Sequence, residues 1–388
     1  MVKRILGFFY IWRAILFLFA IVGTYCFAFN RGITPFFFLP RFTYYIRIWA
    51  NFDGVSYLTI AREGYYNFEY PFFPLFPLSI RLAHNFFHIP YLIGGQLIAT
   101  ISFLLALVVF TRILELDRQK KLSTLLIALV FLLPTSFYYI TVYNDSLFLL
   151  FATLTIYASR RKQWFLAGFW GGLATLTRLN GLALFFLIYS EYLTSSMDGV
   201  RETWNLKKVW NHQKTITLRK LIKDRIFAII LIPLSFLAYL AYVHIAHGDW
   251  NLVFSSMKIW HQDKMIFPFQ TVWRYFKILV LYPTFLPNYW IALLECLSVL
   301  LYTFLLVFSY KKIRFSYWIF FAISILIPAL TGTFQGMPRY GLHLYPFFLS
   351  LALFFEKKDN KVLLVYFTGC MLLGFLFVMM FTRGYFVA

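Results

Sequence analysis

Charged residues are scarce in this sequence. Only 13% of its 388 residues are Asp, Glu, Lys or Arg, about half the share found in soluble domains. Cysteine is scarcer still: Cys26, Cys296 and Cys370 lie in or beside apolar segments and match no metal or redox spacing. We interpret all three as small core residues. This composition is not that of a soluble globular protein.

Several functional signatures are also missing. The sequence has no phosphate-binding glycine loop and no nucleotide fingerprint. His244 and His247 lie close to Asp249, but this spacing is too weak to predict a metal site. We therefore expect neither a metal nor a cofactor. No clear small-residue cleavage site follows the first apolar run, which favours a membrane-spanning helix over a signal peptide. No internal repeat is visible.

What the sequence does contain is mostly apolar. Its residues are 61% hydrophobic and 22% aromatic, and apolar runs near the roughly 20 residues that cross a bilayer recur along its length. Backbone that faces lipid must be helical, so the pattern predicts an all-α polytopic integral membrane protein. We expect about eleven spans in one membrane domain, residues 1–388.

The basic residues indicate how the chain crosses the membrane. The formal net charge is +21, and these residues lie in short loops between apolar runs, which indicates topology and contact with anionic lipid rather than nucleic acid. Lys3 and Arg4 before the first span place the N-terminus in the cytoplasm. The same rule makes residues 195–225 a cytoplasmic loop and residues 30–90 and 247–287 two outer loops. The first outer loop should contain interfacial helices.

The predicted fifth span, Trp164 to Thr177, is rich in glycine. Gly168, Gly171 and Gly172 follow one another closely within it. Small residues let helices approach each other in lipid, so we expect tight helix packing here.

Unusual polar residues gather on the predicted outer face, where ionisable groups at membrane depth are candidates for function. They are Asp53, Arg62, Glu63, Glu69, Asp145, Arg178, Asp249, Asp263 and Arg339.

Asp53 is the first of these candidates. It lies between Phe52 and Gly54 at the head of a stretch, residues 51–82, that is dense in polar, turn-forming and aromatic residues. A carboxylate in such a loop could take a proton from an acceptor hydroxyl. The alternative is a helix N-cap.

The residues that follow have two interpretations each. Arg62 could pair with a phosphate, or form a local ion pair with Glu63 on a solvated helix face. The strip FFPLFP, residues 72–77, could line a groove for a lipid chain, or simply break the chain before an interfacial helix. Asp145, two residues after Tyr143, could belong to the site or cap the fourth span.

Two arginines need anionic partners. Arg178 lies between two apolar spans with Asn180 behind it, a position that suits either a phosphate or a structural carboxylate. Arg339, with Tyr340, is a similar case at the top of the predicted tenth span. His343, one turn further along, is expected to be a hydrogen-bonded core residue rather than a base.

This chain resembles the PIG-V mannosyltransferases, the family of GPI mannosyltransferase II and its prokaryotic relatives. The similarity runs in matching order from about residue 50 to residue 350. The principal matching segments are Phe52-Asp53-Gly54, Tyr57-Leu58, Gly64-Tyr65, the FFPLFP strip, Tyr143-x-Asp145, Thr177-Arg178-x-Asn180-Gly181 and Pro338-Arg339-Tyr340. Two positions depart from the family pattern, since Phe52 replaces the usual Trp and Asp145 the more common Glu.

The resemblance implies a GT-C glycosyltransferase that uses a sugar linked to polyprenyl phosphate. By this resemblance Asp53 is the catalytic base of an inverting reaction, in which the acceptor hydroxyl attacks the anomeric carbon and polyprenyl phosphate leaves. Arg178 or Arg339 would stabilise the leaving phosphate. The expected substrate-binding residues are Arg62, Glu63, Tyr143, Asp145, Arg178, Asn180, Arg339 and Tyr340.

The expected partners are the polyprenyl-phosphate-sugar donor, a lipid-linked or glycan acceptor, and membrane lipid. The sugar would be mannose, and the membrane the plasma membrane of a prokaryote or the endoplasmic reticulum of a eukaryote. The missing nucleotide motif agrees, because an outer-face enzyme has no cytosolic nucleotide sugar to use. Two alternatives remain: a GT-C scaffold without activity, and a lipid or solute transporter or flippase, which should show discontinuous helices and mid-membrane polar residues.

Overall fold

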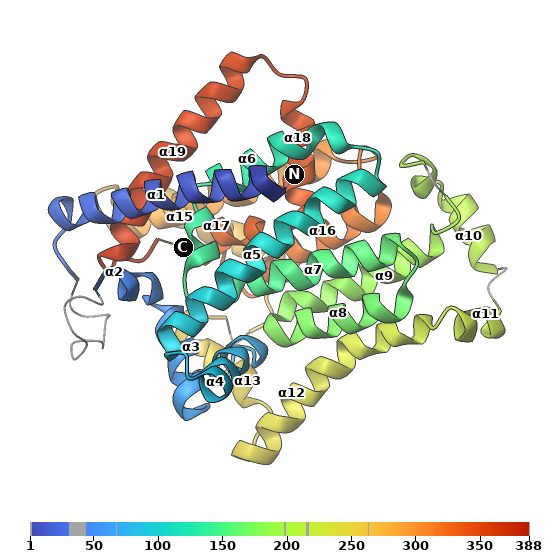
Figure 1. Ribbon diagram of the computed structural model, residues 1–388, viewed down its shortest axis with the longest axis horizontal. Helices are drawn as coiled ribbons and strands as arrows, with labels where there is room; N and C mark the ends of the chain where they lie inside the picture. The colour runs from blue at the N-terminus through green and yellow to red at the C-terminus, as the bar shows by residue number, and fades with distance from the viewer. Residues whose placement is uncertain are drawn as a thin grey trace.

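The computed structural model describes residues 2–30, 44–66, 68–197, 199–214, 217–262 and 264–387. Within these ranges the secondary structure is entirely helical (Figure 1), which confirms the expected all-α fold. Asp263 and residues 31–43, which the sequence assigns to the outer loops, lie outside the described residues.

Five of the described helical segments are long and apolar enough to cross a membrane. They are α1 (Val2–Cys26), α5 (Tyr91–Leu116), α12 (Leu231–His247) with the 3-10 turn before it, α15 (Pro287–Phe308) and α19 (Asn360–Thr382). The protein is therefore a multi-pass membrane protein, as the hydropathy predicts.

The remaining predicted spans are shorter helices, of 10 to 16 residues. They are α6 (Ser123–Leu132), α7 (Asp145–Arg160), α8 (Trp164–Thr177), α9 (Ala183–Leu193), α16 (Phe315–Ala329) and α18 (Tyr345–Phe355). Several are extended by 3-10 turns, such as Leu179–Leu182 before α9. The expected number of about eleven spans is consequently not confirmed.

Short helices occupy the predicted loops. In the outer loops and beside them are α2 (Tyr44–Arg47), α3 (Asp53–Glu63), α4 (Leu75–Phe87), α13 (Leu252–Ser255), α14 (Pro268–Leu281) and α17 (Met337–Tyr340). The basic loop contains α10 (Leu206–Lys214) and α11 (Leu218–Lys223). In Figure 1, α3, α4 and α13 gather at one end of α5, away from α10 and α11.

The glycines of α8 let it pack tightly against α12. A Cβ atom on Gly168 would lie 2.1 Å from the carbonyl oxygen of Ala228, and one on Gly171 would lie 2.7 Å from Cδ1 of Ile232. No side chain fits at such distances, so the close packing expected from the sequence is confirmed.

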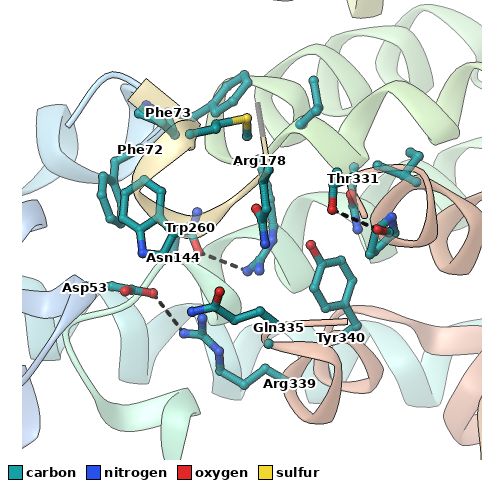
Figure 2. A pocket seen from close by; sticks show the side chains of 18 of the residues that line it. Asp53, Phe72, Phe73, Asn144, Arg178, Trp260, Thr331, Gln335, Arg339 and Tyr340 are labelled. Carbon is teal, nitrogen blue, oxygen red and sulfur yellow. Dashed lines mark hydrogen bonds and ion pairs between the residues drawn. The ribbon is translucent and has the colours of Figure 1, made fainter. Parts of the chain in front are cut away.

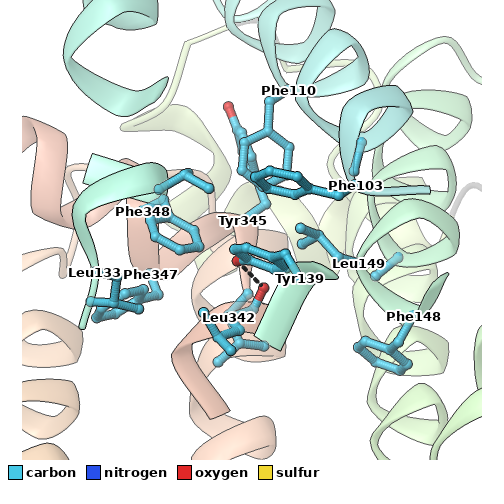
Figure 3. Packing of buried hydrophobic residues seen from close by; sticks show 14 of the residues in the cluster. Phe103, Phe110, Leu133, Tyr139, Phe148, Leu149, Leu342, Tyr345, Phe347 and Phe348 are labelled. Atoms are coloured by element: carbon cyan, nitrogen blue, oxygen red, sulfur yellow. Dashed lines mark hydrogen bonds between the residues drawn. The ribbon is translucent and has the colours of Figure 1, made fainter. Parts of the chain in front are cut away.

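An aromatic core fixes the segment that follows α17 (Figure 3). Tyr139 stacks on Phe103 with 4.3 Å between ring centroids, and its hydroxyl donates a 2.8 Å hydrogen bond to the carbonyl oxygen of Leu342. The hydroxyl of Tyr302 donates to the carbonyl oxygen of Met337 at 2.8 Å and accepts from the Gly341 amide at 2.9 Å. These contacts hold α17 rigidly, which matters because α17 contains Arg339.

A buried ionic network joins the helix ends opposite to this region. Arg160 at the C-terminal end of α7 and Arg314 before α16 both donate to Oε1 of Glu191, each at 2.9 Å. Arg160 also bonds Asp117 at 2.9 Å. Glu191 and Arg314 are both only 2% exposed, so the network ties α5, α7, α9 and α16 together in a region largely shielded from solvent.

Replacing Glu191 by Gln should destabilise the protein by about 3–5 kcal/mol, because it removes the buried negative charge that Arg160 and Arg314 both contact. The apparent melting temperature of the purified protein in detergent measures this effect. Glu115→Gln is the matched control, since within the described residues Glu115 forms only surface ion pairs, with Arg112 and Lys120, and should change little. Equal melting temperatures for the two variants would contradict a structural role for the network.

Candidate active site

A cavity of about 190 Å³ opens among segments that are distant in the sequence. Its walls come from α3 and the loop after it, the start of the loop between α8 and α9, the segment after α13, and the region around α17 (Figure 2). Both predicted outer loops thus contribute to one cavity. Five of the expected catalytic and substrate-binding residues line it, namely Asp53, Arg178, Asn180, Arg339 and Tyr340, together with Phe72 and Phe73 of the FFPLFP strip.

Asp53 is the first residue of α3. Its Oδ2 accepts a 3.0 Å hydrogen bond from Nη1 of Arg339, and its side chain is 26% exposed. The preceding residue, Phe52, has φ 55° and ψ −119°, a strained conformation for a residue with a Cβ atom. Phe52 packs against Phe381 and Phe386, so tertiary contacts hold the strained turn and fix the direction of the carboxylate.

Two aromatic rings pack against the guanidinium group of Arg339. Its guanidinium carbon lies 5.0 Å from the ring centroid of Tyr138 and 5.2 Å from that of Tyr143. Tyr143 is buried and donates through its hydroxyl to the carbonyl oxygen of Asn51 at 2.9 Å. Tyr143 therefore contacts Arg339 and is not among the residues that line the cavity.

Arg178 is held by a buried polar cluster. Its Nη1 donates to Oδ1 of Asp145 at 3.2 Å and to Oδ1 of Asn144 at 3.3 Å, and lies 2.9 Å from Nε2 of His343. Asp145 and His343 are fully buried and bonded to each other. The interpretation of His343 as a hydrogen-bonded core residue is thus confirmed. Asp145 lies behind Arg178 rather than at the cavity surface.

Asn180 presents an unused donor at the cavity. The residue is only 3% exposed, and its Nδ2 has no hydrogen-bond partner among the described residues. Buried polar groups are normally paired. Asn180 therefore lines the cavity with a side chain whose amide nitrogen is enclosed and unpaired within the described residues.

Arg62 and Glu63 lie outside this cavity. They come at the C-terminal end of α3, with side chains 72% and 53% exposed, and their nearest charged atoms are 3.7 Å apart. This is the local ion pair that the sequence allowed as an alternative. The structure does not bring the two residues together with Asp53.

Several cavity residues were not assigned to the site from the sequence. They are Trp260, Gln335 and Phe386, which all line the cavity. The one available signal was the position of Gln335, four residues before Arg339. Nothing local in the sequence places Trp260 or the C-terminal Phe386 near Asp53.

Glu69 is a buried carboxyl in the loop that leads to Phe72 and Phe73 of the cavity wall. It is 5% exposed, and its Oε2 has no hydrogen-bond partner in the described part of the chain. Burial raises the pKa of Glu69 from 4.5 to about 7. Between these values the folded chain binds a proton more tightly than the unfolded chain, so stability falls as pH rises from about 4.5 to about 7.

Glu69→Gln should therefore raise the melting temperature at pH 8, by about 2 °C or more, because the neutral amide avoids burying a charge. At pH 5 the wild-type carboxyl is largely protonated when folded, and the difference should shrink. Melting curves in detergent at both pH values measure it. If the melting temperatures of Glu69→Gln and the wild type differed by the same amount at pH 5 and pH 8, burial of the charge would not be the cause of the difference.

The arrangement defines a class of protein. One carboxylate and two guanidinium groups converge on a cavity at one side of a bundle of membrane helices, which suits a transferase that acts on a polar, charged substrate at the face of a membrane. The sequence model of the mannosyltransferase (PIG-V) family matches residues 2–306. The chain belongs to this family, and the protein is a membrane glycosyltransferase. This membership favours the glycosyltransferase interpretation over the transporter.

The match ends before Arg339 and Tyr340, so their place in the site rests on the structure and on the resemblance drawn above. No curated protein matches the sequence significantly. Among solved structures, the oligosaccharyltransferase of Archaeoglobus fulgidus, crystallised with zinc and sulfate, is similar with a TM-score of 0.41 and 10% identity. The similarity covers 96% of this chain and 53% of that one, so this chain spans about half its length.

Proposed function

We propose that the protein transfers mannose from a polyprenyl-phosphate-linked donor to a hydroxyl group of a lipid-linked or glycan acceptor. The reaction takes place on the outer face of the membrane, with the N-terminus in the cytoplasm. The observation that carries this proposal is the convergence of Asp53 with Arg178 and Arg339 on one cavity. Such a site offers a base for the acceptor and cations for the phosphate of the donor.

Asp53 acts as the base. Arg339 occupies its Oδ2, while no hydrogen bond engages Oδ1 within the described residues, so Oδ1 is the oxygen that receives the proton of the acceptor hydroxyl. The hydroxyl oxygen attacks the anomeric carbon as the bond from that carbon to the phosphate oxygen breaks. Attack opposite to the leaving group inverts the anomeric configuration. Polyprenyl phosphate departs with the bonding electrons.

The two arginines stabilise the departing phosphate. Arg178 and Arg339 both line the cavity, and their side chains are 18% and 11% exposed, so the charge that develops on the phosphate meets cations largely shielded from water. Asp145 and Tyr143 act through them: Asp145 fixes Arg178, and the Tyr143 ring supports Arg339. They are positioning residues, whereas Arg62 and Glu63 take no part in this mechanism.

Four further residues contact the substrate in this proposal. Asn180 lines the cavity beside Arg178 and contacts the sugar. Tyr340 lies with its ring under the Arg178 guanidinium, 5.2 Å from centroid to carbon, and lines the same wall. Trp260 and Phe72 stack edge to face with 5.8 Å between centroids and give the sugar or the first isoprene unit an apolar surface.

The test of this function compares two donors. Membranes that contain the protein receive mannose labelled with tritium, either as polyprenyl-phosphate mannose or as a nucleotide-linked sugar, after endogenous transfer from the nucleotide sugar to polyprenyl phosphate has been blocked. We expect label in extracted acceptor only with the polyprenyl-phosphate donor. Transfer from the nucleotide sugar alone would contradict the proposed donor. Movement of labelled lipid across the membrane without transfer would favour the transporter.

A further inference from the structure

A second cavity adjoins the candidate active site. It has a volume of about 300 Å³ and lies between α14 and α15, next to the segment that precedes α17. Gln335 and Phe386 line both this cavity and the one that contains Asp53. In Figure 2 the amide of Gln335 lies between Asp53 and Tyr340. The two cavities therefore share a wall.

Glu295 is the unusual residue of the second cavity. It is 4% exposed and lies about two turns inside α15, one of the helices that can cross the membrane. Its Oε2 accepts a 2.5 Å hydrogen bond from the hydroxyl of Tyr275, and Glu295 forms no ion pair in the part of the chain that the structure describes. A carboxyl group at membrane depth is costly and is a candidate for function by default.

A network of hydrogen bonds holds Glu295 in place. The Tyr275 hydroxyl also lies 3.0 Å from Oγ1 of Thr333 and accepts from the backbone amide of Phe334 at 3.0 Å. This network connects α14, α15 and the segment before α17, and it fixes Glu295 at the cavity wall. Asn288, Gln335 and Thr333 add two amides and a hydroxyl to the same wall, so the cavity offers both donors and acceptors.

The position of α14 makes this cavity accessible from the membrane. The helix buries Thr271 and Tyr275 on one face and exposes Trp273, Phe276 and Val280 on the other, each more than half exposed. An amphipathic helix with aromatic residues on its outer face suits the boundary between headgroups and acyl chains. The cavity between α14 and the membrane-spanning helix α15 is therefore at the depth of the lipid headgroups.

We propose that this cavity is the acceptor subsite and binds the hydroxyl-rich headgroup of a lipid acceptor, such as a glycosyl or polyol headgroup. The inference rests on the proposed function and names the place of its second substrate. Charge separates the two substrates: the cavity with Arg178 and Arg339 takes the phosphate of the donor, whereas the Glu295 carboxyl accepts hydroxyl protons in hydrogen bonds and disfavours a phosphate. The shared wall at Gln335 then directs an acceptor hydroxyl toward Asp53.

The test measures transfer as a function of acceptor supply. Purified protein is reconstituted with polyprenyl-phosphate mannose and increasing amounts of total lipid extract from the source cells, and label in lipid product is counted. For Glu295→Gln, we expect the half-saturating amount of extract to rise at least tenfold, while the half-saturating donor concentration changes less than threefold. Tyr275→Phe, which removes the group that orients Glu295, should show a smaller shift in the same direction. Glu115→Gln, far from both cavities, is the control.

The outcomes separate the inference from the proposed function. No transfer by wild-type protein would overturn both. Wild-type transfer with an unchanged extract dependence in Glu295→Gln would overturn the acceptor subsite and leave the glycosyltransfer intact. A fall in the maximal rate of both Glu295 and Tyr275 variants, without any change in half-saturation, would also overturn it, because that result is expected from a purely structural role.

Discussion

Replacing Asp53 by Asn should lower the rate of mannose transfer by about 10²–10⁴-fold, the usual contribution of a positioned general base. The amide keeps the size of the side chain and can still accept a hydrogen bond from Arg339 through its oxygen, but it cannot take the proton of the acceptor. The loss should therefore appear in kcat, with little change in protein yield or in the half-saturating donor concentration. Initial rates with labelled polyprenyl-phosphate mannose measure it.

A matched control is available for this variant. Asp249 also lies on the predicted outer face, but its carboxylate only accepts a 2.8 Å hydrogen bond from the backbone amide of Asn251, and it does not line the cavity. Asp249→Asn should retain wild-type transfer. If Asp53→Asn and Asp249→Asn transferred equally well at equal protein level, Asp53 would not be the base.

The second large effect is expected at Arg178. Arg178→Lys keeps the positive charge but loses the planar fork that can contact Asp145 and a phosphate together. We expect kcat to fall about 10²–10³-fold, as for the loss of one preorganised group that stabilises a leaving anion. Arg178→Leu should also destabilise the protein by about 3–5 kcal/mol, because it leaves the buried Asp145 without its arginine.

Comparison of the two Arg178 variants separates catalysis from structure. Transfer rates and melting temperatures are measured for both, with Arg161→Lys as the control, since Arg161 is exposed and its side chain contacts only Tyr157 within the described residues. A melting temperature near that of the wild type with a strongly reduced kcat in Arg178→Lys supports contact with the phosphate. Normal kcat in Arg178→Lys would leave Arg178 with the structural ion pair alone.

Much of the site follows from the distribution of polar residues along the sequence. Because basic loops mark one side of the membrane, Asp53, Arg178 and Arg339 could be assigned to the same face before any contact was known. The sequence could not pair them: Arg339 meets Asp53 across 286 positions, and His343 meets Asp145 across 198. Such pairings depend on how the helices pack, which local patterns do not encode.

The limits of the sequence are clear at particular elements. The run from Leu179 to Leu193 reads as one apolar span, but it begins with a 3-10 turn and its α-helix is only 11 residues long. Hydropathy cannot distinguish a short buried helix from a full span, which is why the expected number of about eleven spans is not confirmed. Trp260 and Gln335 reach the cavity through loops, and the positions of loops are determined by the tertiary contacts of their ends.

For Arg62 and Glu63, a short distance in the sequence was misleading. Arg62 and Glu63 follow Asp53 closely in the sequence and fall within the stretch that resembles the family, yet α3 is 11 residues long and carries them about 14 Å along its axis from Asp53. Nearness in sequence therefore indicated a shared site that the helix geometry does not provide. Tyr143 and Asp145 show a similar distinction. They contact Arg339 and Arg178 but do not line the cavity, so in the proposed mechanism they support the residues that bind the substrate and do not bind it themselves.

The most direct test of this account is a structure of the protein with a phosphonate analogue of polyprenyl-phosphate mannose that cannot be cleaved. The account predicts that the phosphonate lies between Arg178 and Arg339, within hydrogen-bonding distance of both, and that the anomeric carbon faces the Asp53 carboxylate. Phosphonate density in another cavity, such as the one beside Arg81 between α4 and α12, with the Asp53 cavity empty, would contradict it.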